Sequence, residues 1–309
     1  TLRNSSAASD VYKRQIVMVD FMASSIPVAL TIAGSDSGGG AGIQADLRTF
    51  AFHCVHGTSA LTCITAQNTL GVNRVDALLP EAVKAQIEAV VKDIGVQGTK
   101  TGMLLNQEII LVVAEVVETL SLKQLVVDPV MVSRAGVQLI DNSAVAALRD
   151  FLLPKASIVT PNIYEAQILA GLDINDISDM QLAAEKIHKL GVKTVLVKGG
   201  ALKHDLRGVD VWFDGDCFET LKTATVETTN THGTGCTLSA AITANLARGQ
   251  DLFSAVKLAK DYITNALKYA LEIGKGQGPV GHFFPLLLNT YSSLQHFGEV
   301  GRDALIQGP

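Results

Sequence analysis

The sequence predicts an α/β protein with a doubly wound, mainly parallel sheet, flanked by helices and folded as a single domain. Short apolar runs alternate with segments of helical periodicity along almost the whole chain. These runs are continuously apolar, as strands are when both faces of a sheet are covered by helices. We find no internal repeat and no linker that would divide the chain. Ligands of such sheets bind beyond the carboxyl ends of the strands, where we therefore expect the site.

Length and composition fit one large domain with a sizeable core. The chain has 309 residues, of which 48% are hydrophobic and 18% are charged. The net charge of −5 and the lack of a dense Lys/Arg cluster argue against a nucleic-acid partner. No apolar run approaches ~20 residues, so we expect no membrane-spanning helix. The four cysteines form no C-x-x-C pair, which favours a reducing compartment, and we expect the cytoplasm.

The two ends of the chain differ from its middle. Residues 1–25 lack helical or strand periodicity, and we interpret them as a disordered or non-native extension. Met18 or Met22 would be a sensible natural start, and we expect the first 20 or so residues to be dispensable. Residues 26–288 carry the predicted domain. Residues 289–309 are a tail whose role the sequence does not indicate.

In the first half of the domain, turn residues and prolines separate the predicted elements. A glycine-rich turn at 38–42 follows the first strand, and Pro80 opens a helix at the position that proline favours. Pro129 stops a later strand. The expected elements are strand 27–33, a helix from the turn to about 53, strand 58–66, a helix from 80, strand 97–101, helix 107–120 and strand 124–128.

The second half continues the alternation and then adds a hairpin. Asp214-Gly215-Asp216 lies between two strand-like runs and predicts that hairpin. The expected elements are helix 143–152, strand 158–160 stopped by Pro161, further helices, strand 194–198, hairpin strands 209–213 and 217–221, a helix after Cys236, and a long helix over about 251–273.

The most informative stretch is Thr231-His232-Gly233-Thr234-Gly235-Cys236, directly before a predicted helix. Two glycines allow the backbone to approach a ligand closely. The free N–H groups and the positive dipole end of the helix then form an anion site, for which phosphate is the usual ligand. At this position we expect the pKa of the Cys236 thiol to fall. The stretch indicates phosphoryl transfer, and the alternative is a glycine-rich helix start with a buried cysteine.

The first glycine loop invites a different interpretation. Gly40-Ala41-Gly42-Ile43-Gln44-Ala45 matches the dinucleotide pattern G-x-G-x-x-A after a strand. The next strand should then end in an acidic residue that holds a ribose, but it ends in Thr65-Ala66-Gln67-Asn68. No Gly-Lys-Ser/Thr follows the loop, so it is not a P-loop either. The hypothesis of an NAD-dependent oxidoreductase therefore depends on this match alone.

Polar residues at other strand ends leave two interpretations open. Asn162 and Glu165 can cap a helix, or Glu165 can join Asp128 in holding a hydrated Mg²⁺ bound to phosphates. Lys198 beside a glycine pair can reach a phosphate, or it can be solvated. His232 can act as a base, although a loop histidine is more often incidental.

Together these pieces resemble the ribokinase-like superfamily, and within it the hydroxymethylpyrimidine/phosphomethylpyrimidine kinases of thiamine biosynthesis. The matches follow one another in order over roughly residues 27–285. They are Ala33-Gly34-Ser35-Asp36, Gly39 to Leu47, Thr65 to Thr69, Lys100 to Leu104, Val127 to Met131, Thr160 to Ala166, Val197 to Gly200, Thr231 to Cys236, and Gly278-Pro279 with His282-Phe283. The family commonly has Ser where this chain has Gly38, which adds freedom to the loop.

The resemblance implies an ATP- and Mg²⁺-dependent kinase. It would phosphorylate 4-amino-5-hydroxymethyl-2-methylpyrimidine and then its monophosphate, and it would be a homodimer. The resemblance also assigns roles to the matching residues. Cys236 would be the catalytic base with Gly233 and Gly235 in the anion hole; Gln67 would bond the pyrimidine in a pocket lined by Gly34, Asp46 and Met103; Lys198, Thr231 and Asn162 would bind ATP; Asp128 and Glu165 would serve Mg²⁺.

Two other functions compete with this one. A pyridoxal or pyridoxine kinase of the same superfamily also acts on a hydroxymethyl group of a flat nitrogen heterocycle. A non-catalytic nucleotide-binding module could keep the fold. The non-catalytic alternative is disfavoured because one chain contains all of the candidate site residues Cys236, Asp128, Asn162, Glu165 and Lys198.

Overall fold

The computed structural model describes residues 26–131, 140–200 and 207–288. The expected extension 1–25, with the candidate starts Met18 and Met22, and the tail 289–309 lie outside the described residues. Among the described residues, none of the helices combines the length and the apolar character needed to cross a bilayer.

A central sheet carries the fold, with strand order β10-β9-β8-β7-β6-β5-β1-β2. The strands from β8 to β2 in this order pair in parallel, whereas β9 pairs antiparallel with both β8 and β10. This confirms the mainly parallel sheet and the expected hairpin. The bounds are β1 Val28–Ala33, β2 His56–Leu61, β5 Gly98–Thr101, β6 Leu125–Val127, β7 Ile158–Val159, β8 Val195–Lys198, β9 Val209–Phe213 and β10 Phe218–Lys222.

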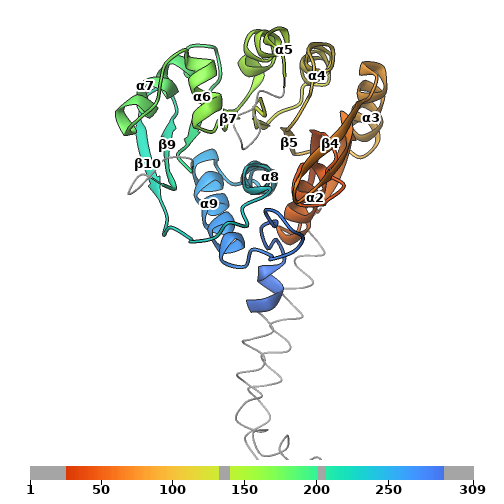
Figure 1. The fold of residues 1–309 in the computed structure, drawn as a ribbon. Helices are drawn as coiled ribbons and strands as arrows, with labels where there is room; N and C mark the ends of the chain where they lie inside the picture. The colour runs from red at the N-terminus through yellow and green to blue at the C-terminus, as the bar shows by residue number, and fades with distance from the viewer. Residues whose placement is uncertain (1–25, 132–139, 201–206, 289–309) are drawn as a thin grey trace, which may run out of the picture.

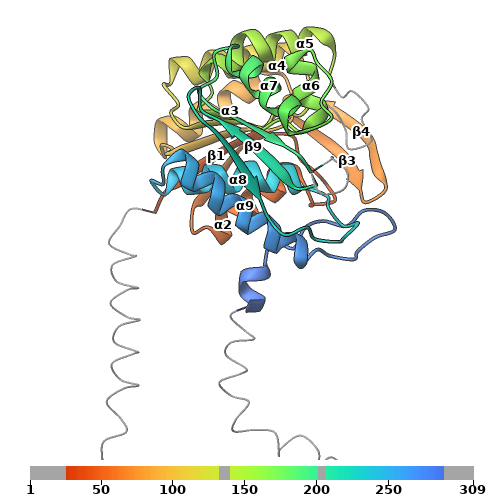
Figure 2. The same ribbon diagram turned by 90° about the vertical axis from the view of Figure 1, so that its left-hand side faces the viewer.

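Helices cover both faces of this sheet, so its strands are buried on both sides (Figures 1 and 2). One layer packs around a large aliphatic core and consists of α3 (Pro80–Asp93), α4 (Gln107–Thr119), α5 (Asn142–Ala147), α6 (Ile163–Ala170) and α7 (Ile177–His188). The other layer consists of α2 (Gly42–Phe52), α8 (Thr234–Ala247) and α9 (Leu252–Lys268). This doubly wound arrangement is the one that the sequence predicts.

The prediction of one continuous strand over 58–66 is wrong, because two strands cover this segment. The structure breaks it at the buried Thr62, whose hydroxyl donates to the Met103 carbonyl, and β2 ends there. Beyond it, β3 (Cys63–Asn68) pairs antiparallel with β4 (Gly71–Ala77) in a separate two-stranded sheet that projects from the domain (Figure 2). Every residue of β4 is exposed, so no burial pattern in the sequence marks this strand.

Two predicted helices are shorter than expected. The helix expected over 251–273 ends at Lys268. The helix expected over 143–152 changes after Ala147 into a π-helical turn, Leu148–Leu152, and then into a short 3₁₀ turn that contains Pro154. Proline lacks an N–H and cannot continue the helix.

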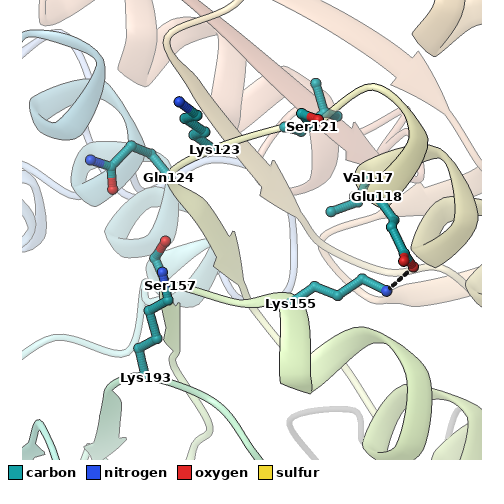
Figure 3. Close-up of a pocket in the computed structure, with 9 residues that line it drawn as sticks. Val117, Glu118, Ser121, Lys123, Gln124, Lys155, Ser157 and Lys193 are labelled. Atoms are coloured by element: carbon teal, nitrogen blue, oxygen red, sulfur yellow. Dashed lines mark hydrogen bonds and ion pairs between the residues drawn. The ribbon is translucent and has the colours of Figure 1, made fainter.

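A hollow of about 600 Å³ lies where β6, β7 and β8 begin, at the opposite end of these strands from their polar carboxyl ends (Figure 3). Its rim carries Lys123, Lys193 and the ion pair of Lys155 with Glu118. None of the residues that the sequence predicts for the site lines it. The candidate site is therefore built from the other end of the sheet.

Candidate active site

The helix expected after the glycine-rich stretch is confirmed as α8. Its N-cap is Gly233, with φ at 82°, a conformation that favours glycine. A Cβ on Gly233 would lie 1.8 Å from the Gly40 carbonyl oxygen, so only glycine lets the two glycine loops touch. A Cβ on Gly235 would lie 3.4 Å from Lys198 Nζ and 3.7 Å from Asp128 Oδ2. The first turn of α8 therefore faces an ammonium and a carboxylate, and the anion site expected there stays a prediction.

Cys236 lies in this first turn, and its thiol accepts a hydrogen bond from the Gly42 N–H. Part of the residue is exposed to solvent. The thiol itself is desolvated, and this raises its pKa to about 11. The ammonium of Lys100 opposes this rise, and the carboxylates of Asp46 and Asp128 add to it. The expected fall of the thiol pKa is thus wrong for the protein without ligands, because desolvation outweighs the helix start.

A buried ion pair lies close to the thiol. Lys100 Nζ is 2.8 Å from Asp46 Oδ1, and the Thr31 hydroxyl donates to Asp46 Oδ2 at 2.6 Å. Burial alone would lower the pKa of Lys100, but Asp46, Cys236 and Asp128 raise it, so the ammonium stays charged. Asp46 has no exposed surface. Its carboxylate is held by Lys100 and Thr31, and its place in lining the pyrimidine pocket stays a prediction.

Asp128 follows β6, and its carboxylate has three side-chain partners among the described residues. Lys198 Nζ lies 3.0 Å from its Oδ1, while the hydroxyls of Thr160 and Ser239 donate to it, each at 3.3 Å. Burial would raise the pKa of Asp128, but Lys198 and Lys100 lower it below the ordinary value. Lys198 and Asp128 therefore stand as a charged pair in front of α8, and their roles toward ATP and Mg²⁺ stay predictions.

Asn162 and Glu165 form a capping box at the start of α6. The Asn162 side chain accepts from the Glu165 N–H at 3.0 Å, and the Glu165 carboxylate accepts from the Asn162 N–H at 2.8 Å. The capping interpretation is thus confirmed. Burial, opposed by Lys198 and reinforced by Asp128, raises the pKa of Glu165 to about 7. The proposed ATP contact of Asn162 and the metal contact of Glu165 remain predictions beside this structural role.

The donor set fits a magnesium ion only in its hydrated, phosphate-bound form. Within the described parts of the chain, no three His, Cys, Asp or Glu side chains gather closely enough to hold a metal. Mg²⁺ in kinase sites keeps several waters and uses one or two carboxylates together with substrate phosphates. Asp128 and Glu165 can supply those carboxylates.

Two residues expected around the pyrimidine, Gly34 and Met103, lie near each other. A Cβ on Gly34 would come within 3.0 Å of Met103 Cε and 2.5 Å of Cys63 Sγ. Gly34 is therefore required by packing, whatever it does for a substrate. Gln67 lies on β3, where its side chain contacts Thr65 and His232. Thr231, expected at ATP, accepts the hydroxyl hydrogen of Thr234 at its carbonyl, and its role stays a prediction.

His232 and Asp36 have a structural role that the sequence analysis did not predict. His232 Nε2 lies 2.8 Å from Asp36 Oδ2, and Asp36 also accepts the N–H groups of Gly38, Gly40 and Ala41. Burial would raise the pKa of Asp36, but His232 and the N–H groups of Ala41 and Gly38 lower it. The two residues fasten the first glycine loop to the loop before α8. An aspartate directly before a glycine-rich turn is the signal that could have indicated this role.

Comparison with known proteins decides the family. The sequence model of phosphomethylpyrimidine kinase matches residues 36–281. The chain belongs to the phosphomethylpyrimidine kinase family. A hydroxymethylpyrimidine/phosphomethylpyrimidine kinase of Synechococcus elongatus is 59% identical over 261 residues, which cover 84% of this chain and 99% of that protein.

Solved structures agree with this membership. A phosphomethylpyrimidine kinase of Clostridium difficile is 45% identical with a TM-score of 0.71, covering 78% of this chain and all of that one. An ADP complex of Bacillus subtilis pyridoxal kinase is 42% identical with a TM-score of 0.79, covering 84% and 98%. Membership of the phosphomethylpyrimidine kinase family confirms the predicted ribokinase-like fold and the ATP-dependent kinase.

Proposed function

We propose that this chain transfers a phosphoryl group from ATP to the hydroxymethyl group of 4-amino-5-hydroxymethyl-2-methylpyrimidine, and then another to the resulting monophosphate. The observation that carries the proposal is family membership over nearly the whole described chain, at 59% identity to a kinase of that name. The charged pair in front of α8 and Cys236 beside it supply the chemical parts that the reaction needs.

Phosphoryl transfer asks a protein mainly to position the reactants and to stabilise charge. Lys198 and the free N–H groups of the first turn of α8 would stabilise the charge on the transferred group. Cys236 would accept the proton of the substrate hydroxyl. With a thiol pKa of about 11 in the free protein, it becomes a base only if bound ligands lower that pKa. Bound Mg²⁺ would neutralise phosphate charge, with Asp128 and Glu165 as its protein carboxylates.

The second transfer uses the same parts. The acceptor is then a phosphate oxygen, which carries no proton that must be removed at neutral pH. We expect Cys236 to matter less for this step than for the first. The monophosphate must lie where the hydroxyl lay before, close to the first turn of α8.

ATP consumption tests the proposal against its two competitors. We expect the protein to consume ATP with the hydroxymethylpyrimidine far faster than with pyridoxal, and not without an acceptor. Lys198→Met, which removes the ammonium in front of α8, is the control for contaminating kinases. Faster turnover of pyridoxal would favour the vitamin kinase alternative, and no turnover of either acceptor would favour a binding module.

We also propose that the protein is a cytoplasmic homodimer. The projecting hairpin exposes a series of apolar side chains, which a second copy could cover. They are Ile64, Leu70, Val72 and Val75. Light scattering after gel filtration should give twice the chain mass, and Val72→Lys combined with Val75→Lys should shift it to the monomer mass.

A further inference from the structure

Backbone hydrogen bonds hold Gln67, one of the residues expected to contact the pyrimidine. A β-bulge lies between Ala66 and Gln67 in the pairing of β3 with β4, and such irregularities re-aim a side chain. The Ser37 hydroxyl donates to the Gln67 carbonyl at 2.7 Å and accepts from the Gln67 N–H at 2.8 Å. These hydrogen bonds therefore fix the backbone at Gln67. The orientation of its side-chain amide, with either the oxygen or the nitrogen toward His232, depends on other neighbours.

The neighbours of the amide decide that orientation. His232 Nε2 faces Asp36 Oδ2 at 2.8 Å, so this nitrogen must carry a hydrogen, because a lone pair there would meet a carboxylate. The nitrogen of the Gln67 amide lies 3.3 Å from the same Nε2. Two donors then face each other. Exchanging the oxygen and nitrogen of the amide by a half-turn turns this contact into a hydrogen bond shared with Asp36.

Thr65 requires the same exchange for a separate reason. A threonine hydroxyl has one hydrogen, and Thr65 donates it to the Ser35 carbonyl at 2.8 Å. Its contact of 3.4 Å with the Gln67 amide oxygen then joins two acceptors. With the amide turned, the –NH₂ group donates to the Thr65 oxygen. One rotation thus satisfies both neighbours.

We propose that His232 and Thr65 hold the Gln67 amide in one orientation, with its oxygen toward His232 and its –NH₂ toward Thr65, and thereby select the substrate edge. This inference rests on the proposed function. In that orientation the amide offers the oxygen to an exocyclic amino group on the His232 side. It offers an N–H to the neighbouring ring nitrogen on the Thr65 side.

The orientation predicts which analogue is rejected. The 4-oxo analogue of the substrate carries a carbonyl in place of the amino group and an N–H in place of the ring nitrogen. Its donor and acceptor are exchanged, so it needs the opposite amide orientation and breaks both contacts of Gln67. Sites with buried polar groups reject such mismatches strongly. His232 and Thr65 are therefore positioning residues that set specificity through Gln67.

The test compares kcat/KM for the amino substrate with kcat/KM for the 4-oxo analogue, because a general loss of catalysis cancels in that ratio. Thr65→Val and His232→Phe should each lower the ratio up to about tenfold, which corresponds to one hydrogen bond. Thr65→Ser keeps the acceptor oxygen and should retain the wild-type ratio. Unchanged ratios in both variants, with the amino substrate still turned over, would overturn the assignment while leaving the proposed function intact.

A second measurement needs no substrate and therefore separates the two claims. In ¹⁵N-labelled wild-type protein, the Gln67 side-chain amide protons should show cross-relaxation to the Thr65 methyl group and not to the ring proton on His232 Cδ2. The opposite pattern would overturn the assignment even if the kinase activity is found. Failure of the kinase assay together with the predicted pattern would contradict only the proposed function.

Discussion

Lys100 and Asp46 form an ion pair in which neither side chain has exposed surface, with Nζ 2.8 Å from Oδ1. The pair lies beside Cys236 and contributes to the pKa of its thiol. It joins β5 to α2, two elements of different layers. The charges under the site are therefore part of its framework, and removing one of them should affect stability before chemistry.

Lys100→Met should lower the free energy of unfolding by about 3–5 kcal/mol, because the Asp46 carboxylate would be left buried without its partner. Urea unfolding measures this loss. Combining it with Asp46→Asn removes the second charge, and the double variant should be more stable than Lys100→Met alone. A single variant within about 1 kcal/mol of wild type would show that the pair is not the buried contact described here.

Gly233→Ala should abolish most activity, because its Cβ would meet the Gly40 carbonyl oxygen at 1.8 Å. Gly249→Ala is the matched control: its φ of +83° is almost the same, and no atom lies within 4 Å of its added Cβ. Both variants carry the backbone strain of about 1 kcal/mol, but only the first should separate the two glycine loops. Steady-state kcat of the two variants is the measurement. Equal losses of kcat in both would contradict the contact between Gly233 and Gly40.

The buried histidine of the C-terminal segment predicts a pH dependence of stability. Burial lowers the pKa of His282 to about 4, from 6.5 in the unfolded chain. The unfolded state therefore binds more protons below pH 6.5, and stability is lost as the pH falls toward 4. His282→Gln should remove about 2 kcal/mol of the loss between pH 7.5 and pH 5. Urea unfolding at both pH values checks this, and parallel losses in both proteins would contradict it.

We expect the thiol of Cys236 to react slowly with alkylating reagents, and we expect the residue to be necessary for the first phosphoryl transfer. With its pKa raised to about 11, it should be alkylated by iodoacetamide at pH 7 more slowly than the exposed Cys54 and Cys217. Cys236→Ala should still bind ATP and should lower kcat for the first transfer by roughly 10²–10⁴-fold. Near-normal turnover by Cys236→Ala would make the thiol a packing residue, and peptide mapping of the alkylated protein checks its reactivity.

The sequence predicted the elements that bury apolar faces and missed those that do not. Most strands of the large sheet and the start of α8 were predicted because apolar runs and glycine-rich turns mark them. Strand β4 was missed because all of its residues are exposed. The candidate site residues stand in the sequence as separate motifs, but the long-range contact of His232 with Asp36 has no local signal. The thiol pKa was misjudged because desolvation depends on the packed structure.

The central claim is that one site phosphorylates the aminopyrimidine and then its monophosphate. Mass spectrometry of the products formed with excess ATP tests it most directly, with samples taken over time. The monophosphate should appear first, and the diphosphate should then replace it. A product that stops at the monophosphate, with pyridoxal phosphorylated equally well, would contradict the account.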